Sequence, residues 1–315
     1  MDPTGLTGMG GSATIRRNPA FAKDTLDLPK KPLVDSFKSG FPFKLYKKFS
    51  SNNTLIKNIQ RCDPPMKFKS LAVIVLAAGK GTRMESPLAK VLQPLGGRPL
   101  LHYVLVSLAP LQANRSIIVV GFQSDRVRLE FSNHELEFAE QREQLGTGHA
   151  ARQAESVLAD FEGDVLVVCG DMPFVKSTTL ATLLERHRET GALCTLLTLK
   201  TPEKKDFGCI IRDEKGAVVR IVEQKDASIE EKKVYEFNAG VYCFDKCFLF
   251  NALASLDNDN AQKEFYLTDT IRYIVESGFG VEAVQIQDAA ELFGVNSMKD
   301  LERAEQFLAE QTQSS

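Results

Sequence analysis

No apolar run in this 315-residue sequence is long enough to cross a bilayer, because the longest one covers only residues 71–78. The N-terminal region contains no hydrophobic stretch of the kind found in signal peptides. A formal net charge of −2 removes the general electrostatic reason to expect a nucleic acid as partner. These absences predict a cytoplasmic protein that binds neither a membrane nor a nucleic acid.

The cysteines form no recognisable framework. All six are scattered along the chain, mostly within apolar runs that resemble strands. This distribution is typical of buried, reduced thiols rather than of a disulfide scaffold. Cys243 and Cys247 stand close together, but no second pair and no neighbouring histidine accompanies them, so their spacing does not indicate zinc.

The first 65 residues differ in composition from the rest of the chain. They are rich in Gly, Pro, Ser, Asn and Lys, and they show no sustained helix or strand periodicity. We expect residues 1–65 to form an N-terminal extension, either disordered or a leader, and residues 66–315 to form the folded domain. Aromatic residues alternate with lysines over residues 36–56, which leaves a weak membrane- or partner-binding element open as an alternative.

From residue 71 onward, short apolar runs alternate with segments of helical periodicity. We expect strands at 71–77, 116–121, 164–169 and 193–199, and helices at 99–112, 124–131, 148–160 and 176–190. This alternation predicts an α/β protein with a Rossmann-like, doubly wound, mostly parallel sheet and a ligand crevice at the carboxyl ends of its strands. Short strands over 208–245 predict a small β-rich lobe, and helices return at 265–277 and 298–311.

The first of these strands leads into a glycine-containing turn, LAVIVLAAGKGTRM over residues 71–84. Gly79 and Gly81 let backbone N–H groups approach an anion, and Arg83 and Lys90 add positive charge, so a polyphosphate is the expected guest. The spacing matches neither the dinucleotide fingerprint, which has a third glycine, nor the P-loop frame. The alternative is that both glycines serve only the geometry of the turn.

Two oxygen-bearing side chains stand where strands are expected to end. Asp171 follows the strand 164–169, and Asn296 comes just before the last helix. A carboxylate that faces a polyphosphate is repelled unless a cation mediates, which makes Asp171 a candidate Mg²⁺ ligand. Each side chain has a simpler alternative as a helix cap, Asp171 for the helix near Lys176 and Asn296 for the last helix.

Three further segments offer polar groups to the same crevice. The second glycine-rich turn, QLGTGHA over 144–150, has amides suited to an anion or a base edge, unless Thr147 only caps the following helix. Glu223 could accept hydrogen bonds from sugar hydroxyls, or belong to a solvated turn. Asn238 enters an apolar strand and needs hydrogen-bond partners, which a ligand could supply.

Five segments, taken together and in order, carry a family resemblance: LAAGKGTRM at 76–84, QLGTGHA at 144–150, EQKDA at 223–227, EFYLTD at 264–269 and GVN at 294–296. From about residue 71 to 310 the chain resembles the N-terminal uridyltransferase (pyrophosphorylase) domain of bacterial N-acetylglucosamine-1-phosphate uridyltransferase, in the sugar nucleotidyltransferase family. Residues 66–315 would then be a nucleotidyltransferase domain. No run of hexapeptides follows, so we expect neither the β-helix of the acetyltransferase half nor its activity. A homo-oligomer stays open.

The resemblance implies a role for each matching position. The backbone of Leu76, Ala77, Ala78 and Gly79 would hold the nucleotide, and the uracil would be read by Gln141, Gly146 and Thr147. Charge on the triphosphate would be neutralised by Arg83 and Lys90. Mg²⁺, the implied cofactor, would be bound by Asp171 and Asn296. The small lobe would be a sugar-binding lobe, whose sugar-phosphate site would be lined by Gly208, Glu223 and Asn238, with Tyr266 close by.

The implied reaction forms UDP-N-acetylglucosamine and pyrophosphate from UTP and N-acetylglucosamine 1-phosphate. Cys169 and Cys209 occupy positions where the family has other residues. The resemblance therefore indicates the identity of the nucleotide more clearly than that of the sugar. The alternatives within the enzyme class are another sugar 1-phosphate, such as glucose 1-phosphate, or dTTP as donor. A weakly catalytic regulatory homologue is a further alternative. Against it speaks the joint presence of both cations and both candidate metal ligands, Arg83, Lys90, Asp171 and Asn296.

Overall fold

The computed structural model describes residues 70–203 and 207–313. The expected N-terminal extension, residues 1–65, lies outside this range, and so does the aromatic and lysine-rich segment 36–56 within it. In the part of the chain that is described, every helix is too short or too polar to cross a membrane.

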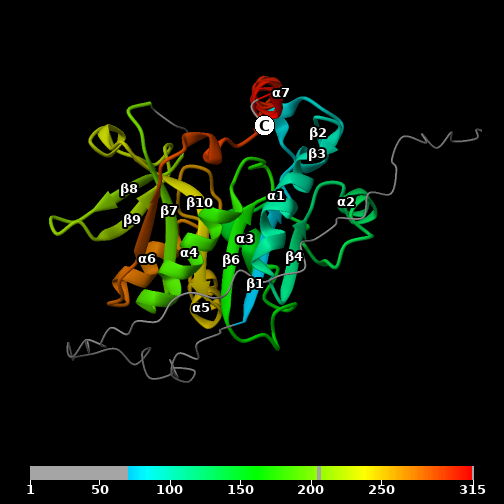
Figure 1. Ribbon diagram of the computed structural model, residues 1–315. Helices are drawn as coiled ribbons and strands as arrows, with labels where there is room; N and C mark the ends of the chain where they lie inside the picture. Colours follow the sequence, from blue (N-terminus) through cyan, green and yellow to red (C-terminus); the bar gives the residue numbers. More distant parts are fainter. Residues whose placement is uncertain (1–69, 204–206, 314–315) are drawn as a thin grey trace, which may run out of the picture. The chain divides into compact units, whose positions relative to one another are not determined.

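A mixed but mostly parallel sheet forms the centre of the fold (Figure 1). Its strands lie in the order β11-β7-β10-β6-β1-β4-β5. Their bounds are Leu71–Ala77 (β1), Arg115–Val120 (β4), Glu137–Glu140 (β5), Asp164–Cys169 (β6), Cys194–Lys200 (β7), Glu236–Asp245 (β10) and Glu282–Ile286 (β11). Every neighbouring pair is parallel except the two that involve β10, which runs antiparallel to β6 and β7. The predicted mostly parallel α/β sheet is therefore confirmed.

The antiparallel strand β10 also builds the predicted β-rich lobe. Its first residues pair with β8 (Cys209–Arg212), which in turn pairs with β9 (Val218–Val222) at one end of the molecule (Figure 1). Because β10 is reversed, it begins at the sheet edge where β1 and β6 end. Asn238, near the start of β10, is thereby placed at the carboxyl edge of the parallel strands.

Helices cover both faces of the sheet. One face packs against α1 (Leu100–Leu108), α2 (Ser124–Glu130) and α4 (Ser177–Thr190), and the other against α3 (Thr147–Arg152), α5 (Lys246–Ala254) and α6 (Asp269–Glu276). Along β1, Val73 and Val75 belong to the first apolar cluster and Ala72 and Ile74 to the second. Because both faces of β1 are buried, its sequence is apolar at every position instead of alternating between polar and apolar residues.

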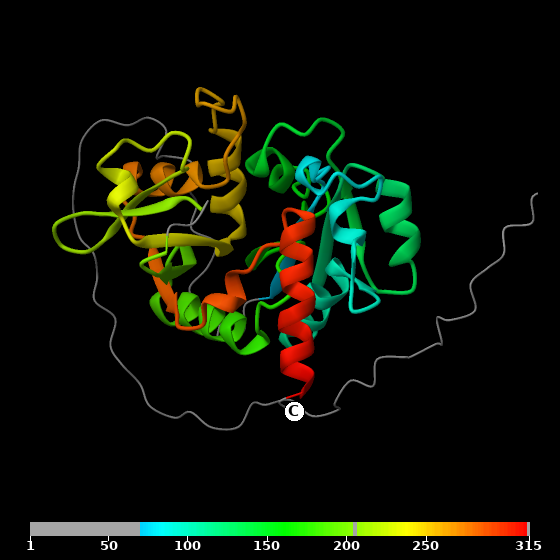
Figure 2. The same ribbon diagram turned by 90° about the horizontal axis from the view of Figure 1, so that it is seen from above.

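The last helix, α7 (Met298–Gln313), lies beyond the carboxyl ends of the strands and is nearest the viewer in Figure 2. It closes a third apolar cluster, which includes Met84, Phe174, Val295 and Leu301. The short elements near this end of the molecule are η2 (Thr82–Met84), η3 (Lys90–Leu92), β2 (Pro94–Leu95), β3 (Arg98–Pro99) and η6 (Ala289–Leu292). The cluster packs the turn that carries Arg83 against the segment that carries Asn296, since their neighbours Met84 and Val295 both belong to it.

Two expected helices are shorter in the structure. The helix expected at 148–160 ends at Arg152, and turns follow it. Ala154 and Leu158 are nevertheless fully buried. The apolar periodicity beyond Arg152 therefore reflects burial of these side chains and not a continuing helix. The helix expected at 265–277 begins only at Asp269, because the preceding backbone bonds to another part of the chain.

Candidate active site

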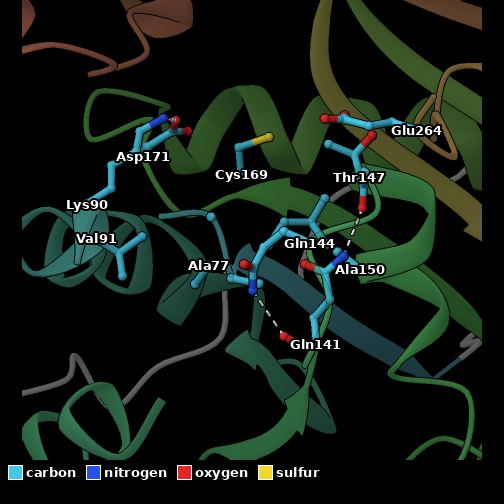
Figure 3. Close-up of a pocket in the computed structure, with 14 residues that line it drawn as sticks. Ala77, Lys90, Val91, Gln141, Gln144, Thr147, Ala150, Cys169, Asp171 and Glu264 are labelled. Carbon is cyan, nitrogen blue, oxygen red and sulfur yellow. Dashed lines mark hydrogen bonds and ion pairs between the residues drawn. The ribbon is translucent and has the colours of Figure 1, made fainter. Parts of the chain in front are cut away.

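A cavity of about 260 Å³ opens at the carboxyl ends of β1 and β6 (Figure 3). The predicted residues that line it are Leu76, Ala77, Ala78, Gly79, Lys90, Gln141, Gly146, Thr147 and Asp171. The structure thus brings the whole predicted nucleotide set together with one predicted cation and one predicted metal ligand. The lining also includes Gln144 and Glu264, which were not assigned roles although both stand in the quoted motifs.

The glycine-rich turn on one side of the cavity has little freedom. At Gly146, φ is +108° and an added Cβ would lie 2.6 Å from the carbonyl oxygen of Phe265, so only glycine fits. The Nε2 of Gln141 donates to the carbonyl of Gly146 over 3.0 Å and lies 3.1 Å from Nδ1 of His149. Gln141 is buried, and these contacts fix the orientation of its amide toward the cavity.

A strap of residues 264–268 connects this turn to the small lobe. Phe265 donates its N–H to Leu145, and Gly148 donates its N–H to Phe265, both over 2.8 Å. The hydroxyl of Thr147 accepts the N–H of Leu267 over 3.1 Å, so it does not cap α3 and that alternative is wrong. The strap therefore holds the turn in place by tertiary hydrogen bonds rather than by helix formation.

On the other side, Thr268 joins the strap to Glu223. The Thr268 hydroxyl is buried and donates to Oε1 of Glu223 over 2.9 Å. Burial raises the pKa of the half-buried Glu223 carboxyl, and this hydrogen bond opposes the rise. Glu223 is therefore not a solvated turn residue, and Thr268, which was not singled out from the sequence, is its partner.

The remaining predicted sugar-site residues gather around Glu223. The backbone of Gly208 packs closely against Ile221 and Glu223, since an added Cβ would lie 2.7 Å from Cγ2 of Ile221 and 3.5 Å from Oε1 of Glu223. Asn238 donates its backbone N–H to the Gly208 carbonyl over 2.8 Å and its amide to the Tyr242 hydroxyl over 2.6 Å. Gly208, Glu223 and Asn238 are thus one constellation in the small lobe.

Tyr266 is not among the residues that line the cavity. The hydroxyl donates to Oδ2 of Asp226 over 3.2 Å, and the side chain is buried. Burial and the Asp226 charge raise the pKa of Tyr266 to about 12, so the phenol stays protonated at neutral pH. Its role is that of a fixed, uncharged donor within the lobe.

At the opposite end of the cavity, the Lys90 ammonium joins two oxygens. It forms an ion pair with Asp171, and it donates to Oδ1 of Asn296 over 2.7 Å. Figure 3 shows the Lys90 and Asp171 side chains pointing toward one another. Asp171 does not cap α4, because the N–H of Lys176 at that helix start is accepted by Glu291 over 3.2 Å.

Asn296 is held in this position from both sides. The N–H of Val295 donates to the Asp171 carbonyl over 3.0 Å, and the Asp300 carboxylate accepts the N–H of Asn296 over 3.1 Å. Ser297, not Asn296, caps α7, because its hydroxyl accepts the N–H of Asp300 over 3.2 Å. The capping alternatives for both Asp171 and Asn296 are therefore wrong.

The oxygens of Asp171 and Asn296 suit a small divalent cation. Both already converge on one positive charge, the ammonium of Lys90. No cluster of three or more His, Cys, Asp or Glu side chains with metal-ligand geometry occurs among the described residues. Mg²⁺ does not need one, because it usually binds one or two protein carboxylates and completes its octahedron with phosphate oxygens and water.

Arg83 is separate from this arrangement. It lies exposed on η2, it does not line the cavity, and within the described ranges it makes no ion pair. Its neighbour Met84 is only 1% exposed, so the backbone beneath Arg83 is fixed while the guanidinium stays in solvent.

Comparison with known proteins identifies the family. Residues 72–309 match the sequence model of the family described as Nucleotidyl transferase. The chain is 46% identical over 241 residues to the bifunctional protein GlmU of Pelobacter propionicus, covering 76% of this chain and 52% of that protein. It is 45% identical over 235 residues to bifunctional GlmU of Limosilactobacillus fermentum, covering 75% and 51%. Bifunctional GlmU of Desulfotalea psychrophila is 42% identical over 238 residues, covering 76% and 70%.

The first two of these relatives are about twice as long as the part that this chain matches. The similarity extends from the start of β1 into α7 and includes every residue of the cavity. This chain belongs to the nucleotidyl transferase family.

Proposed function

We propose that the protein transfers a uridylyl group from UTP to N-acetylglucosamine 1-phosphate, giving UDP-N-acetylglucosamine and pyrophosphate. The observation that carries the proposal is the Lys90 ammonium, held beside Asp171 and Asn296 in a cavity that the whole predicted nucleotide set lines. Family membership supplies the reaction type, and the five motif segments supply the substrates by resemblance. The reduced cysteines and balanced charge suit a cytoplasmic enzyme.

The reaction requires alignment of the two substrates and neutralisation of their phosphate charges, and it does not require a general base. The phosphate of the sugar 1-phosphate is already an anion, and it would attack the α-phosphorus of UTP in line with the departing pyrophosphate. Lys90, and Arg83 from the exposed η2 that follows the turn, would neutralise charge on the triphosphate and on the leaving group. The backbone of residues 76–79 would hold the nucleotide.

The fixed amide of Gln141 would read the base. Its Nε2 is occupied by the Gly146 carbonyl, which leaves Oε1 to accept a hydrogen bond from the uracil ring. Gly146 and Thr147 would contact the base from the same turn.

Asp171 and Asn296 would hold Mg²⁺, which when bound would neutralise and orient phosphate oxygens. At the sugar end, Glu223 keeps one carboxylate oxygen beyond its bond to Thr268, and that oxygen would accept hydrogen bonds from sugar hydroxyls. Asn238 and the backbone of Gly208 would complete the sugar-phosphate site, with Tyr266 close by.

A pyrophosphate-release assay with Mg²⁺ tests the proposal. UTP, dTTP, CTP and GTP are each paired with several sugar 1-phosphates, and the largest kcat/KM is expected for UTP with N-acetylglucosamine 1-phosphate. Lys90→Ala and Asp171→Ala should each lower turnover by on the order of 10²–10³, as the loss of one preorganised charge does elsewhere. Lys80→Ala is the matched control, because Lys80 lies outside the cavity lining, over the Phe122 ring.

If pyrophosphate were released most efficiently with another sugar 1-phosphate or with dTTP, that compound would be the substrate instead. Near-normal turnover in both Lys90→Ala and Asp171→Ala would refute the assignment of the site. No release with any pair would favour a regulatory protein on the same fold.

A further inference from the structure

The Lys90 ammonium lies between the side-chain oxygens of Asp171 and Asn296, which are the two oxygens proposed to bind a metal. The Lys90 and Asp171 side chains are only 14% and 18% exposed, so solvent does little to replace the contact between them. The Asn296 oxygen lies 2.7 Å from the same nitrogen. A single positive charge therefore satisfies both oxygens in the protein without ligands.

The oxygens and the ammonium differ in how firmly they are held. The backbone bonds from Val295 to Asp171 and from Asn296 to Asp300 hold the segments that carry the oxygens. The Asn296 amide also donates to the Gly294 carbonyl over 3.2 Å. The ammonium sits at the end of a flexible four-carbon stem, whose terminal torsions change at little cost. The cation can therefore move without disturbing the oxygens.

The stem of Lys90 also passes the phosphate-binding turn. An added Cβ at Gly81 would lie 2.8 Å from Cβ of Lys90 and 3.3 Å from its Cγ and Cδ. Gly81 has φ of +65°, and its missing side chain makes this close packing feasible. An ammonium that leaves Asp171 and Asn296 is consequently already beside the turn proposed to hold the triphosphate.

We infer that Lys90 occupies the cation position before the metal binds, and that a divalent cation displaces its ammonium toward the phosphate-binding turn. This inference rests on the proposed function, because it uses the metal ligands assigned there. Metal and lysine compete for the same two oxygens in the protein without nucleotide. A triphosphate on the turn gives the displaced ammonium a new partner, so nucleotide and metal should strengthen each other's binding reciprocally.

Mn²⁺ binding to the protein without nucleotide tests the competition, measured by electron paramagnetic resonance of the free ion. Lys90→Met keeps the length of the stem and removes the charge, and it should bind Mn²⁺ tighter by on the order of tenfold, the effect of losing a largely buried competitor. Lys80→Met removes the same charge from the neighbouring turn, where the side chain lies over the Phe122 ring, and it should bind Mn²⁺ like the wild type. Equal affinity of Lys90→Met and wild type, or an equal gain in Lys80→Met, would overturn the inference.

A second readout uses the wild-type protein alone, so it does not depend on how well a variant folds. Lysine acetylation by a water-soluble reagent is followed at Lys90 and Lys80 by mass spectrometry, with and without Mg²⁺. Mg²⁺ should accelerate acetylation at Lys90, because the released ammonium loses its protecting ion pair, and should leave Lys80 unchanged. Protection or no change at Lys90 contradicts displacement.

The two failures are distinguishable. If wild-type protein releases pyrophosphate from UTP in Mg²⁺ while Lys90→Met binds Mn²⁺ no tighter, displacement is wrong and the proposed function stands. If Mn²⁺ binds neither protein, with or without UTP, both the displacement and the proposed metal site are wrong.

Discussion

The hydroxyl of Thr268 is predicted to position the Glu223 carboxylate for the sugar substrate. Thr268→Val removes this hydroxyl while it keeps the shape of the side chain at a site that is only 5% exposed. Substrate binding should suffer on the sugar side, because Glu223 then loses its donor. The strap contacts made by the neighbouring backbone of Phe265 and Leu267 do not involve the hydroxyl and should persist.

The size of the expected loss in kcat/KM follows from the negative charge on Glu223, which accepts the hydrogen bond. A hydrogen bond to a charged group contributes about 1.5–3 kcal/mol, which corresponds to a roughly 10- to 100-fold lower kcat/KM for the sugar 1-phosphate. The same bond opposes the rise in the pKa of Glu223 that burial causes. Its loss raises that pKa further, so Glu223 is protonated at a higher pH and the acid limb of the profile for the sugar 1-phosphate moves to higher pH.

Steady-state kinetics over a pH series measure both effects. Thr268→Ser should recover most of the activity, because it restores the hydroxyl. Thr270→Val is the matched control, since the buried Thr270 hydroxyl donates to the Leu267 carbonyl over 2.6 Å and does not reach Glu223. An unmoved acid limb in Thr268→Val, or an equal shift in Thr270→Val, would refute the positioning role.

Three shorter predictions concern other parts of the site. Gly146→Ala should cost on the order of 1–3 kcal/mol in unfolding free energy, because its Cβ would lie 2.6 Å from the Phe265 oxygen at φ of +108°; Gly191→Ala, with open space around it, should cost less in the same urea titration. Burial raises the folded-state pKa of Glu223, so its stabilising contribution is present at low pH and lost as pH rises through that pKa. Glu223→Gln should therefore raise the free energy of unfolding at neutral pH by about 1 kcal/mol while it lowers activity. Burial raises the pKa of the Cys169 thiol to about 12, so the thiol should react only slowly with iodoacetamide at neutral pH. Mass spectrometry of the treated protein measures the extent of modification.

The buried centre of the sheet could be predicted from the sequence, and its edges could not. The expected bounds 71–77 and 164–169 match β1 and β6, whose two buried faces require an unbroken apolar run. Two strands of the central sheet, β5 and β11, were not predicted. They are the two ends of the strand order, and their sequences EFAE and EAVQI mix polar with apolar residues. Helix α5 was also missed, because its sequence KCFLFNALA is apolar nearly all round and shows no amphipathic period.

Motif residues near the strand ends could be placed from the topology, but their partners could not. Asp171 was expected in the crevice because it follows a central strand, and it lies there. Its contact with Lys90, which also reaches Asn296 over a separation of 206 residues, requires the packing of α7 and the third apolar cluster. Thr268 carried no signal of its own, since a threonine before a helix is usually a cap and this one instead donates to Glu223.

The two ends of the site differ in how ligand binding changes the existing hydrogen bonds. At the proposed sugar end, Glu223 and Asn238 are each oriented by a protein donor or acceptor and retain further capacity, so a sugar would add bonds without breaking these. This is preorganisation, which spares the site reorganisation when the substrate binds. At the proposed cation end, Lys90 would have to give up Asp171 and Asn296 before it could bind a triphosphate, so binding there would exchange one set of partners for another. Because the exchange needs both a cation for the oxygens and an anion for the ammonium, this end should respond to the metal–nucleotide complex more strongly than to either component alone.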